Sequence, residues 1–175
     1  MIRQTKRYSI ALFLLLAGCA TGEADVGDLC PTGAIREQIN AEIQKGVAAT
    51  RDQDIDAYMD GIPDAYRIVE DDGSITDKEM LREYALKSWA IIDKTIALEI
   101  QLNSIAVAPD CSEATVYTSQ RWERIMRRRT GDGADNVVTT QTHRELWRKA
   151  GARWLNYEIV ELGGKIFVNG EPYTP

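Results

Sequence analysis

Residues 95–129 read TIALEIQLNSIAVAPDCSEATVYTSQRWERIMRRR, and the spacing of their apolar side chains differs from that of the chain before them. In the first half of this stretch, apolar side chains recur at every second position, which places them on one face of a strand: Ile96, Leu98, Ile100 and Leu102. Pro109-Asp110 provides a turn, and a second long strand is expected at 113–129. Two long strands joined this closely predict an antiparallel pair.

Further strands are expected toward the C-terminus. Residues 136–149 and 153–161 have strand character and are joined by a turn at Gly151. Gly163-Gly164 is expected to separate a last short strand, KIFVN, from this pair.

Two helices are expected before the strands. The first has apolar residues at every fourth position, one stripe of an amphipathic helix: Ile35, Ile39, Ile43 and Val47. Asp77 can cap the second, whose predicted buried side holds Met80, Leu81, Tyr84, Trp89 and Ile92. Helices followed by long antiparallel strands predict an α+β fold with the helices on one face of the sheet.

The N-terminus has the features of an export signal. Basic residues precede a wholly apolar run at residues 10–16, which is too short to span a membrane because that takes about 20 residues. Leu16-Ala17-Gly18-Cys19 resembles the lipobox of bacterial lipoproteins, and the alternative is an ordinary secreted protein. We therefore expect a signal peptide at 1–18, lipid on Cys19, a flexible tether at 19–31 and one domain at 32–175.

This reading predicts a protein of the cell envelope that is held at the membrane by its N-terminal lipid. Ala20 resembles outer-membrane sorting, which in a Gram-negative host would place the protein on the periplasmic face of the outer membrane.

The charge and the cysteine content indicate which binding partners and cross-links the chain can have. The chain has 21 Lys and Arg against 27 Asp and Glu, a net charge of −6, and this acidic balance argues against nucleic-acid binding. An oxidising compartment permits a disulfide between Cys30 and Cys111, and two free thiols are the alternative. The chain has no CxxC motif or Cys/His cluster with zinc spacing, so we expect no metal and no cofactor.

Three stretches resemble the nuclear-transport-factor-like superfamily, which includes the ketosteroid isomerases and the SnoaL-like proteins. They are RDQDIDAYMDGI at 51–62, YRIVEDDGS at 66–74 and LWRKAGARW at 146–154, and the resemblance extends over residues 35–162. It implies a cystatin-like cone in which a curved antiparallel sheet wraps around the long N-terminal helix and leaves a pocket. It also implies a tendency to form homodimers through the outer face of the sheet.

The same resemblance suggests two catalytic candidates. Asp71 matches the general base of the isomerases, and His143 stands where their acidic hydrogen-bond donor would be, while the tyrosine of their first helix has no counterpart. Asp71 could instead stabilise an Asp-Asp-Gly turn, and His143 could be a structural residue.

The sequence therefore predicts a lipoprotein, more plausibly without catalysis, that binds a small apolar ligand or an envelope protein partner. The expected pocket lies between the first helix and the strands, with four candidate ligand-binding residues: Tyr58, Tyr66, Gln120 and His143. One alternative is a general acid–base isomerase, cyclase or dehydratase that uses Asp71 and His143. Another is a structural assembly subunit with a filled core.

Overall fold

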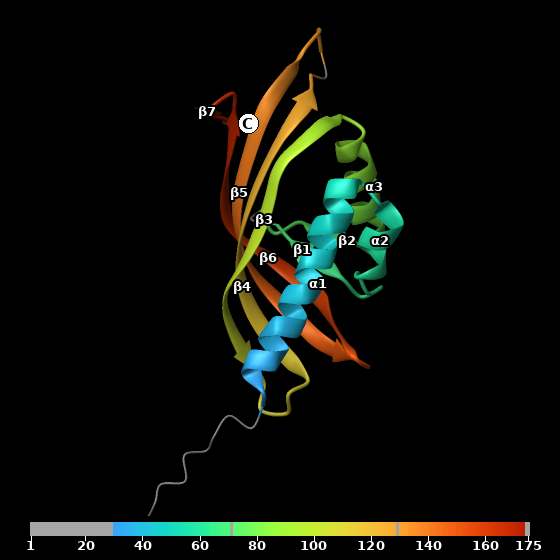
Figure 1. Ribbon diagram of the computed structural model, residues 1–175, viewed down its shortest axis with the longest axis vertical. Helices are drawn as coiled ribbons and strands as arrows, with labels where there is room; N and C mark the ends of the chain where they lie inside the picture. Colours follow the sequence, from blue (N-terminus) through green and yellow to red (C-terminus); the bar gives the residue numbers. More distant parts are fainter. Residues whose placement is uncertain (1–29, 71, 129, 174–175) are drawn as a thin grey trace, which may run out of the picture.

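The computed structural model describes residues 30–70, 72–128 and 130–173 (Figure 1). The predicted signal peptide, Cys19 and most of the predicted tether lie outside the described residues, as does Asp71. The helices are α1 (Thr32–Asp52), α2 (Ile55–Asp60) and α3 (Lys78–Trp89). None of the helices within the described ranges is long and apolar enough to cross a membrane.

A seven-stranded sheet curves around these helices (Figure 1). Its strands are β1 (Arg67–Val69), β2 (Ile75–Asp77), β3 (Ile92–Val107), β4 (Glu113–Arg127), β5 (Ala134–Ala150), β6 (Arg153–Val168) and β7 (Glu171–Pro172). They lie in the order β2-β1-β6-β5-β4-β3, with β7 also paired to β6. The predicted α+β fold, with a curved sheet and a long N-terminal helix, is confirmed, although β1 runs parallel to β6 whereas the other neighbours are antiparallel.

Helix α1 packs along the sheet through the stripe predicted from its four-residue spacing. Ile35, Ile39, Ile43 and Val47 are all buried. They contact a cluster contributed by four strands: Leu98, Leu102, Ala114, Val116, Trp147 and Trp154. This stripe holds α1 against β3 and β6, and the second half of the helix lines a cavity.

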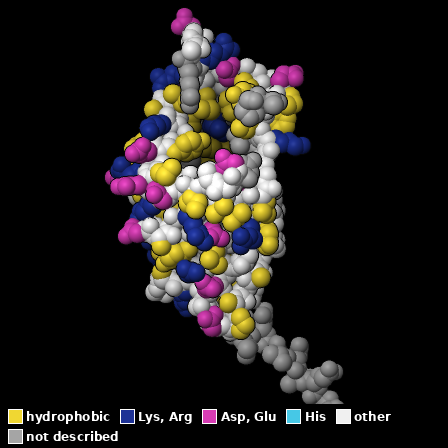
Figure 2. Space-filling view, turned by 180° about the vertical axis from the view of Figure 1, so that it is seen from behind, with side chains coloured by type: hydrophobic (Ala, Val, Ile, Leu, Met, Phe, Trp, Pro, Cys, Tyr) yellow, Lys and Arg dark blue, Asp and Glu magenta, His cyan; other side chains and the backbone are white. Residues whose placement is uncertain are grey.

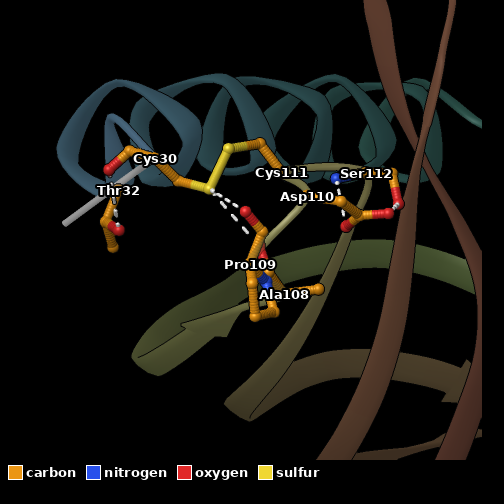
Figure 3. Close-up of a disulfide and its surroundings, with 7 residues drawn as sticks. All are labelled: Cys30, Thr32, Ala108, Pro109, Asp110, Cys111 and Ser112. Atoms are coloured by element: carbon orange, nitrogen blue, oxygen red, sulfur yellow. Dashed lines mark hydrogen bonds between the residues drawn. A yellow bond between two sulfur atoms is a disulfide. The ribbon is translucent and has the colours of Figure 1, made fainter.

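A disulfide between Cys30 and Cys111 fixes the start of α1 to the turn between β3 and β4 (Figure 3). The two Cα atoms are 5.5 Å apart and 81 positions apart in sequence. The Cys30 sulfur also lies 3.3 Å from the carbonyl oxygen of Ala108. The start of α1 and the β3–β4 turn are therefore joined covalently and packed against each other at one end of the molecule.

Strand β6 continues through Gly163 and Gly164, so the break predicted there is wrong. The pairing of β5 with β6 shifts between Thr142 and His143, which is a bulge that accommodates an extra residue. Gly163 has a φ of 143°, and a Cβ on Gly164 would lie 2.7 Å from the carbonyl oxygen of Thr140. The two glycines therefore let the strand bend and approach β5 closely rather than ending it.

Asp77 caps α3 as predicted, accepting a hydrogen bond from the backbone N–H of Met80 at 2.9 Å.

Three apolar residues that were expected on the inner faces of α3 and β3 are exposed. The buried stripe of α3 is narrow, however, and leaves Met80 53% and Tyr84 66% exposed. Ile96 is exposed as well, because a bulge between Thr95 and Ala97 interrupts the alternation of β3.

Candidate functional site

A cavity of about 760 Å³ lies between the second half of α1, helices α2 and α3, and the sheet face that these helices cover. The space-filling view shows the surface hollowed in the upper part of the molecule, with hydrophobic side chains around the hollow (Figure 2). A volume of this size can hold a small organic molecule. The filled core expected of a purely structural subunit is therefore not found.

Aromatic side chains form much of the cavity wall. All four tryptophans of the chain line it, on α3, β4, β5 and β6: Trp89, Trp122, Trp147 and Trp154. The ring of Tyr58 meets that of Trp89 edge to face, with centroids 5.6 Å apart. Aliphatic residues such as Ile43, Val47 and Leu98 complete a largely apolar surface.

The four residues predicted to bind a ligand all line this cavity: Tyr58, Tyr66, Gln120 and His143. Gln120 lies opposite Gln141 in the pairing of β4 with β5 and donates a hydrogen bond to it at 3.3 Å. Asp71, the predicted general base, lies outside the described residues. Its neighbour Glu70 does line the cavity.

Glu145 is a buried carboxyl group of the cavity wall that the sequence did not single out. It is 5% exposed and accepts three hydrogen bonds: from the Thr118 hydroxyl at 2.6 Å, the Trp147 indole N–H at 2.8 Å and the Asn156 amide at 2.9 Å. Burial raises the pKa of Glu145 above its usual range, and the bonds from Thr118 and Trp147 only partly oppose this.

Two tyrosine hydroxyls stay protonated at neutral pH. Burial raises the pKa of Tyr58 to about 12. Burial also raises the pKa of Tyr66 well above its usual range, and nearby Tyr58, Glu145 and Glu70 raise it further. Tyr66 is only 4% exposed, yet its hydroxyl makes no hydrogen bond with any described residue. It is therefore a neutral polar group available to a ligand.

Glu70 and Glu161 form a pair of neighbouring carboxyl groups across β1 and β6. Burial raises the pKa of Glu70, and the Glu161 carboxyl, within hydrogen-bonding reach, raises it further. Glu70 also accepts a hydrogen bond from the Thr76 hydroxyl at 3.2 Å, and Glu161 accepts one from the Gln141 amide at 2.8 Å. A neighbouring carboxyl group makes ionisation of Glu70 more costly, which favours its protonated form.

His143 lies directly opposite Glu161 in the pairing of β5 with β6. Burial lowers the pKa of His143, and the charge of Glu161 only partly opposes this shift. The imidazole is therefore neutral at neutral pH. In this form one ring nitrogen donates a hydrogen bond and the other can accept one.

The period-2 alternation of β5 carried a signal for the residues that were missed. Gln141, His143, Glu145 and Trp147 are each two positions apart, and all four line the cavity. Glu70 and Glu161 are brought to this group by the parallel pairing of β1 with β6, which joins segments 91 positions apart in the chain. Local sequence patterns do not predict such a pairing.

Replacing Glu145 with Gln should remove part of the pH dependence of stability. A carboxyl group whose pKa is higher in the folded state stabilises the fold below its unfolded pKa, and this contribution is lost as the pH rises through the folded pKa. Glutamine keeps the shape, because its oxygen can accept from Trp147 and Asn156 while its amide donates to Thr118. We expect the free energy of unfolding of the wild type, minus that of Glu145→Gln, to fall as the pH rises from about 4 to about 7.

Denaturant unfolding of both proteins across this pH range checks the prediction. The shift of Glu70 and the opposite shifts of surface carboxyl groups are present in both proteins, so they cancel in the difference. A difference that stays constant with pH would contradict the assignment of a raised pKa to Glu145.

Within the described ranges, no three His, Cys, Asp or Glu side chains are grouped so that they could hold a metal ion.

Comparison with known proteins identifies the fold and not the activity. No protein-family model matches the sequence, and no curated protein matches it. Among solved structures, an NTF2-like protein from Cytophaga hutchinsonii aligns with a TM-score of 0.56 at 14% identity, over 72% of this chain and 95% of that one. A ketosteroid isomerase-like protein from Erwinia carotovora atroseptica aligns with a TM-score of 0.54 at 13% identity, over 79% and 96%.

A third solved structure is a provisionally assigned scytalone dehydratase from Novosphingobium aromaticivorans. It aligns with a TM-score of 0.64 at 7% identity, over 76% of this chain and 87% of that one. At these identities the likeness extends to the fold alone. The chain therefore has the nuclear-transport-factor-like fold, as its sequence patterns indicated.

Proposed function

We propose that this protein is held in the cell envelope by a lipid on Cys19 and binds a small, largely apolar molecule in its cavity. The observation that carries the binding proposal is a cavity of about 760 Å³ whose wall includes every tryptophan of the chain. Apolar walls with a few polar groups are the usual composition of sites for small organic ligands.

The anchoring proposal rests on the sequence around Cys19. Basic residues, a short apolar run and small residues before a cysteine are the pattern of a lipidated export signal. Growth of the host with an alkyne-labelled fatty acid should label the full chain, and Cys19→Ala should abolish the label. An unlabelled wild-type protein found free in the culture medium would instead indicate ordinary secretion.

The binding proposal is tested by native mass spectrometry of the full chain purified from its own host. A small molecule retained in a fixed ratio is the expected result. The same spectrum reports any stoichiometric protein partner, and a partner without a small molecule would favour the assembly alternative.

Two glycines of α1 offer a matched pair of variants. Gly46 lines the cavity and Gly33 does not, and a Cβ on either would meet nothing within 4 Å. Gly46→Phe should occupy part of the cavity and reduce the retained molecule, whereas Gly33→Phe should leave it unchanged. Equal retention by both variants would place the bound molecule elsewhere.

An acid–base enzyme is the second candidate, favoured by one observation. The neutral imidazole of His143 lies opposite Glu161, and Glu70, whose pKa burial raises, lines the same cavity, which is large enough for a substrate. If this candidate holds, the molecule retained by a His143→Asn variant should be converted by wild-type protein into an isomer or a dehydrated product. Unchanged mass and chromatographic retention after incubation would argue for binding without catalysis.

A further inference from the structure

The cavity wall around β1, β5 and β6 carries several hydrogen-bond acceptors. Glu70, Glu145 and Glu161 contribute carboxyl groups. Asn156 adds a carbonyl oxygen, because its amide N–H₂ donates to Glu145 and this fixes the orientation of the group. That oxygen is buried and has no hydrogen-bond partner among the described residues. A donor group of a ligand would satisfy this oxygen. The indole N–H of Trp122 and the Nε–H of Arg153, which also line the cavity and have no partner among the described residues, would instead take an acceptor.

The three carboxyl groups have no basic partner. No described Lys, Arg or His side chain lies within ion-pair distance of Glu70, Glu145 or Glu161. His143, the nearest basic side chain to Glu161, is kept neutral by burial, which lowers its pKa. Glu70 and Glu161 are half-buried, and a carboxylate shielded from water without a counter-charge is costly, so a cation that entered the cavity beside them would be favoured there.

Two of the basic residues that line the cavity are ion-paired, and the third, Arg124, has no carboxylate partner among the described residues. Arg153 forms ion pairs with Glu42 and Asp60 at 3.0 and 2.8 Å, and Lys45 pairs with Glu42 at 2.7 Å. Arg124 donates to the Thr139 hydroxyl at 3.0 Å and lies 4.2 Å from the centroid of the Trp122 ring. None of these basic side chains forms an ion pair with Glu70 or Glu161.

The wall suits a positive charge for a second reason. The faces of tryptophan and tyrosine rings attract cations, most strongly where water is excluded. Arg124 on Trp122 shows this interaction within the cavity wall itself. Tyr66 adds a hydroxyl at the cavity that lacks a partner among the described residues and lies close enough to both Glu70 and Glu145 to feel their charges.

We infer that the ligand of this cavity is an organic cation: an amine whose apolar body contacts the tryptophans and whose ammonium group lies at Glu70 and Glu161, beside Tyr66. This inference rests on the proposed binding function and specifies its ligand class. The ammonium would favour the ionised form of Glu70, whose pKa burial raises, so binding would release a proton from this group. Affinity for the cation should therefore fall as the pH is lowered toward the ordinary pKa range of a glutamate carboxyl group.

Three naphthyl probes that differ only in their polar end test the inference: an ethylammonium, an ethanol and an acetate. The full chain in lipid nanodiscs would be titrated with each, using tryptophan fluorescence, because every tryptophan lines the cavity. We expect the ammonium to bind about tenfold or more tightly than the alcohol, the range of a charged hydrogen bond, and the acetate to bind most weakly.

A double substitution tests whether Glu70 and Glu161 bind the ammonium group. The double variant Glu70→Gln, Glu161→Gln keeps the shape and hydrogen-bonding capacity of both side chains and removes both charges. It should lower the affinity for the ammonium about tenfold or more and leave that for the alcohol within about threefold. Glu99→Gln, which lies outside this cavity, is the matched control and should change neither.

Titration of the wild type at several pH values provides a check that needs no variant. The affinity for the ammonium should fall from neutral toward acidic pH, while that for the alcohol stays level. Equal binding of the ammonium and the alcohol would overturn the inference and leave the proposed function intact. Tighter binding of the acetate would also overturn it. Binding of none of the probes, together with no molecule retained from the host, would remove both proposals.

Discussion

Removal of the Cys30–Cys111 disulfide is expected to lower the free energy of unfolding by about 2–4 kcal/mol. The bond closes a loop with a sequence separation of 81. For a loop of this length, the lost entropy of the unfolded chain alone corresponds to about 4.5 kcal/mol at 25 °C. Residual structure in the reduced, unfolded chain lowers the effect that is measured.

Guanidinium unfolding of the full chain, with and without a thiol reductant, measures this contribution. The double variant Cys30→Ser, Cys111→Ser provides the same comparison without reductant, and its stability should no longer respond to reductant. An oxidised wild type with two freely alkylated thiols, or a stability unaffected by reduction, would show that the bond does not form or does not stabilise the fold.

Ile39→Ala should lower the free energy of unfolding by a similar amount, about 2–5 kcal/mol. Ile39 is fully buried in the middle of the α1 stripe, where it packs in the cluster formed with β3–β6. Truncation removes apolar contacts and leaves a void that the surrounding helix and sheet cannot close completely.

Ile75→Ala is the matched control. Ile75 is 54% exposed, so the same truncation should change stability by no more than about 0.5 kcal/mol. Thermal or denaturant unfolding of both variants checks the prediction. Similar losses at the two positions would mean that α1 does not pack on the sheet through this stripe.

The sequence predicted the elements whose pattern is strong and local. The four-residue spacing of Ile35, Ile39, Ile43 and Val47 identified the buried face of α1, because one stripe of that helix meets the sheet. Asp77 identified the start of α3, since capping depends on residues three positions apart. Neither prediction required knowledge of the rest of the fold.

Features that depend on contacts between distant segments were not predictable in this way. Met80 and Tyr84 have the spacing of buried residues but are exposed at the cavity, where α3 has no layer covering it. Gly163 and Gly164 have the composition of a strand break, whereas the close approach of β5 makes them part of a bulge. The pattern of residues along one segment does not show which distant segments will pack against it.

The candidate site was predictable in its location and less so in its chemistry. Tyr58, Tyr66, Gln120 and His143 were assigned to the cavity through the family resemblance and line it. Glu145 was missed because a glutamate on a strand is usually solvated, and its burial depends on donors from β4, β5 and β6.

The disulfide lies at the opposite end of α1 from the cavity, so a force on the N-terminal end is applied away from the cavity. A pull on the chain ahead of Cys30 passes through the two sulfur atoms into the β3–β4 turn, where the sheet bears it along its strands. The cavity lies along the other half of α1, from Glu42 onward. A force or rotation applied at the N-terminal end would therefore leave the geometry of the cavity unchanged.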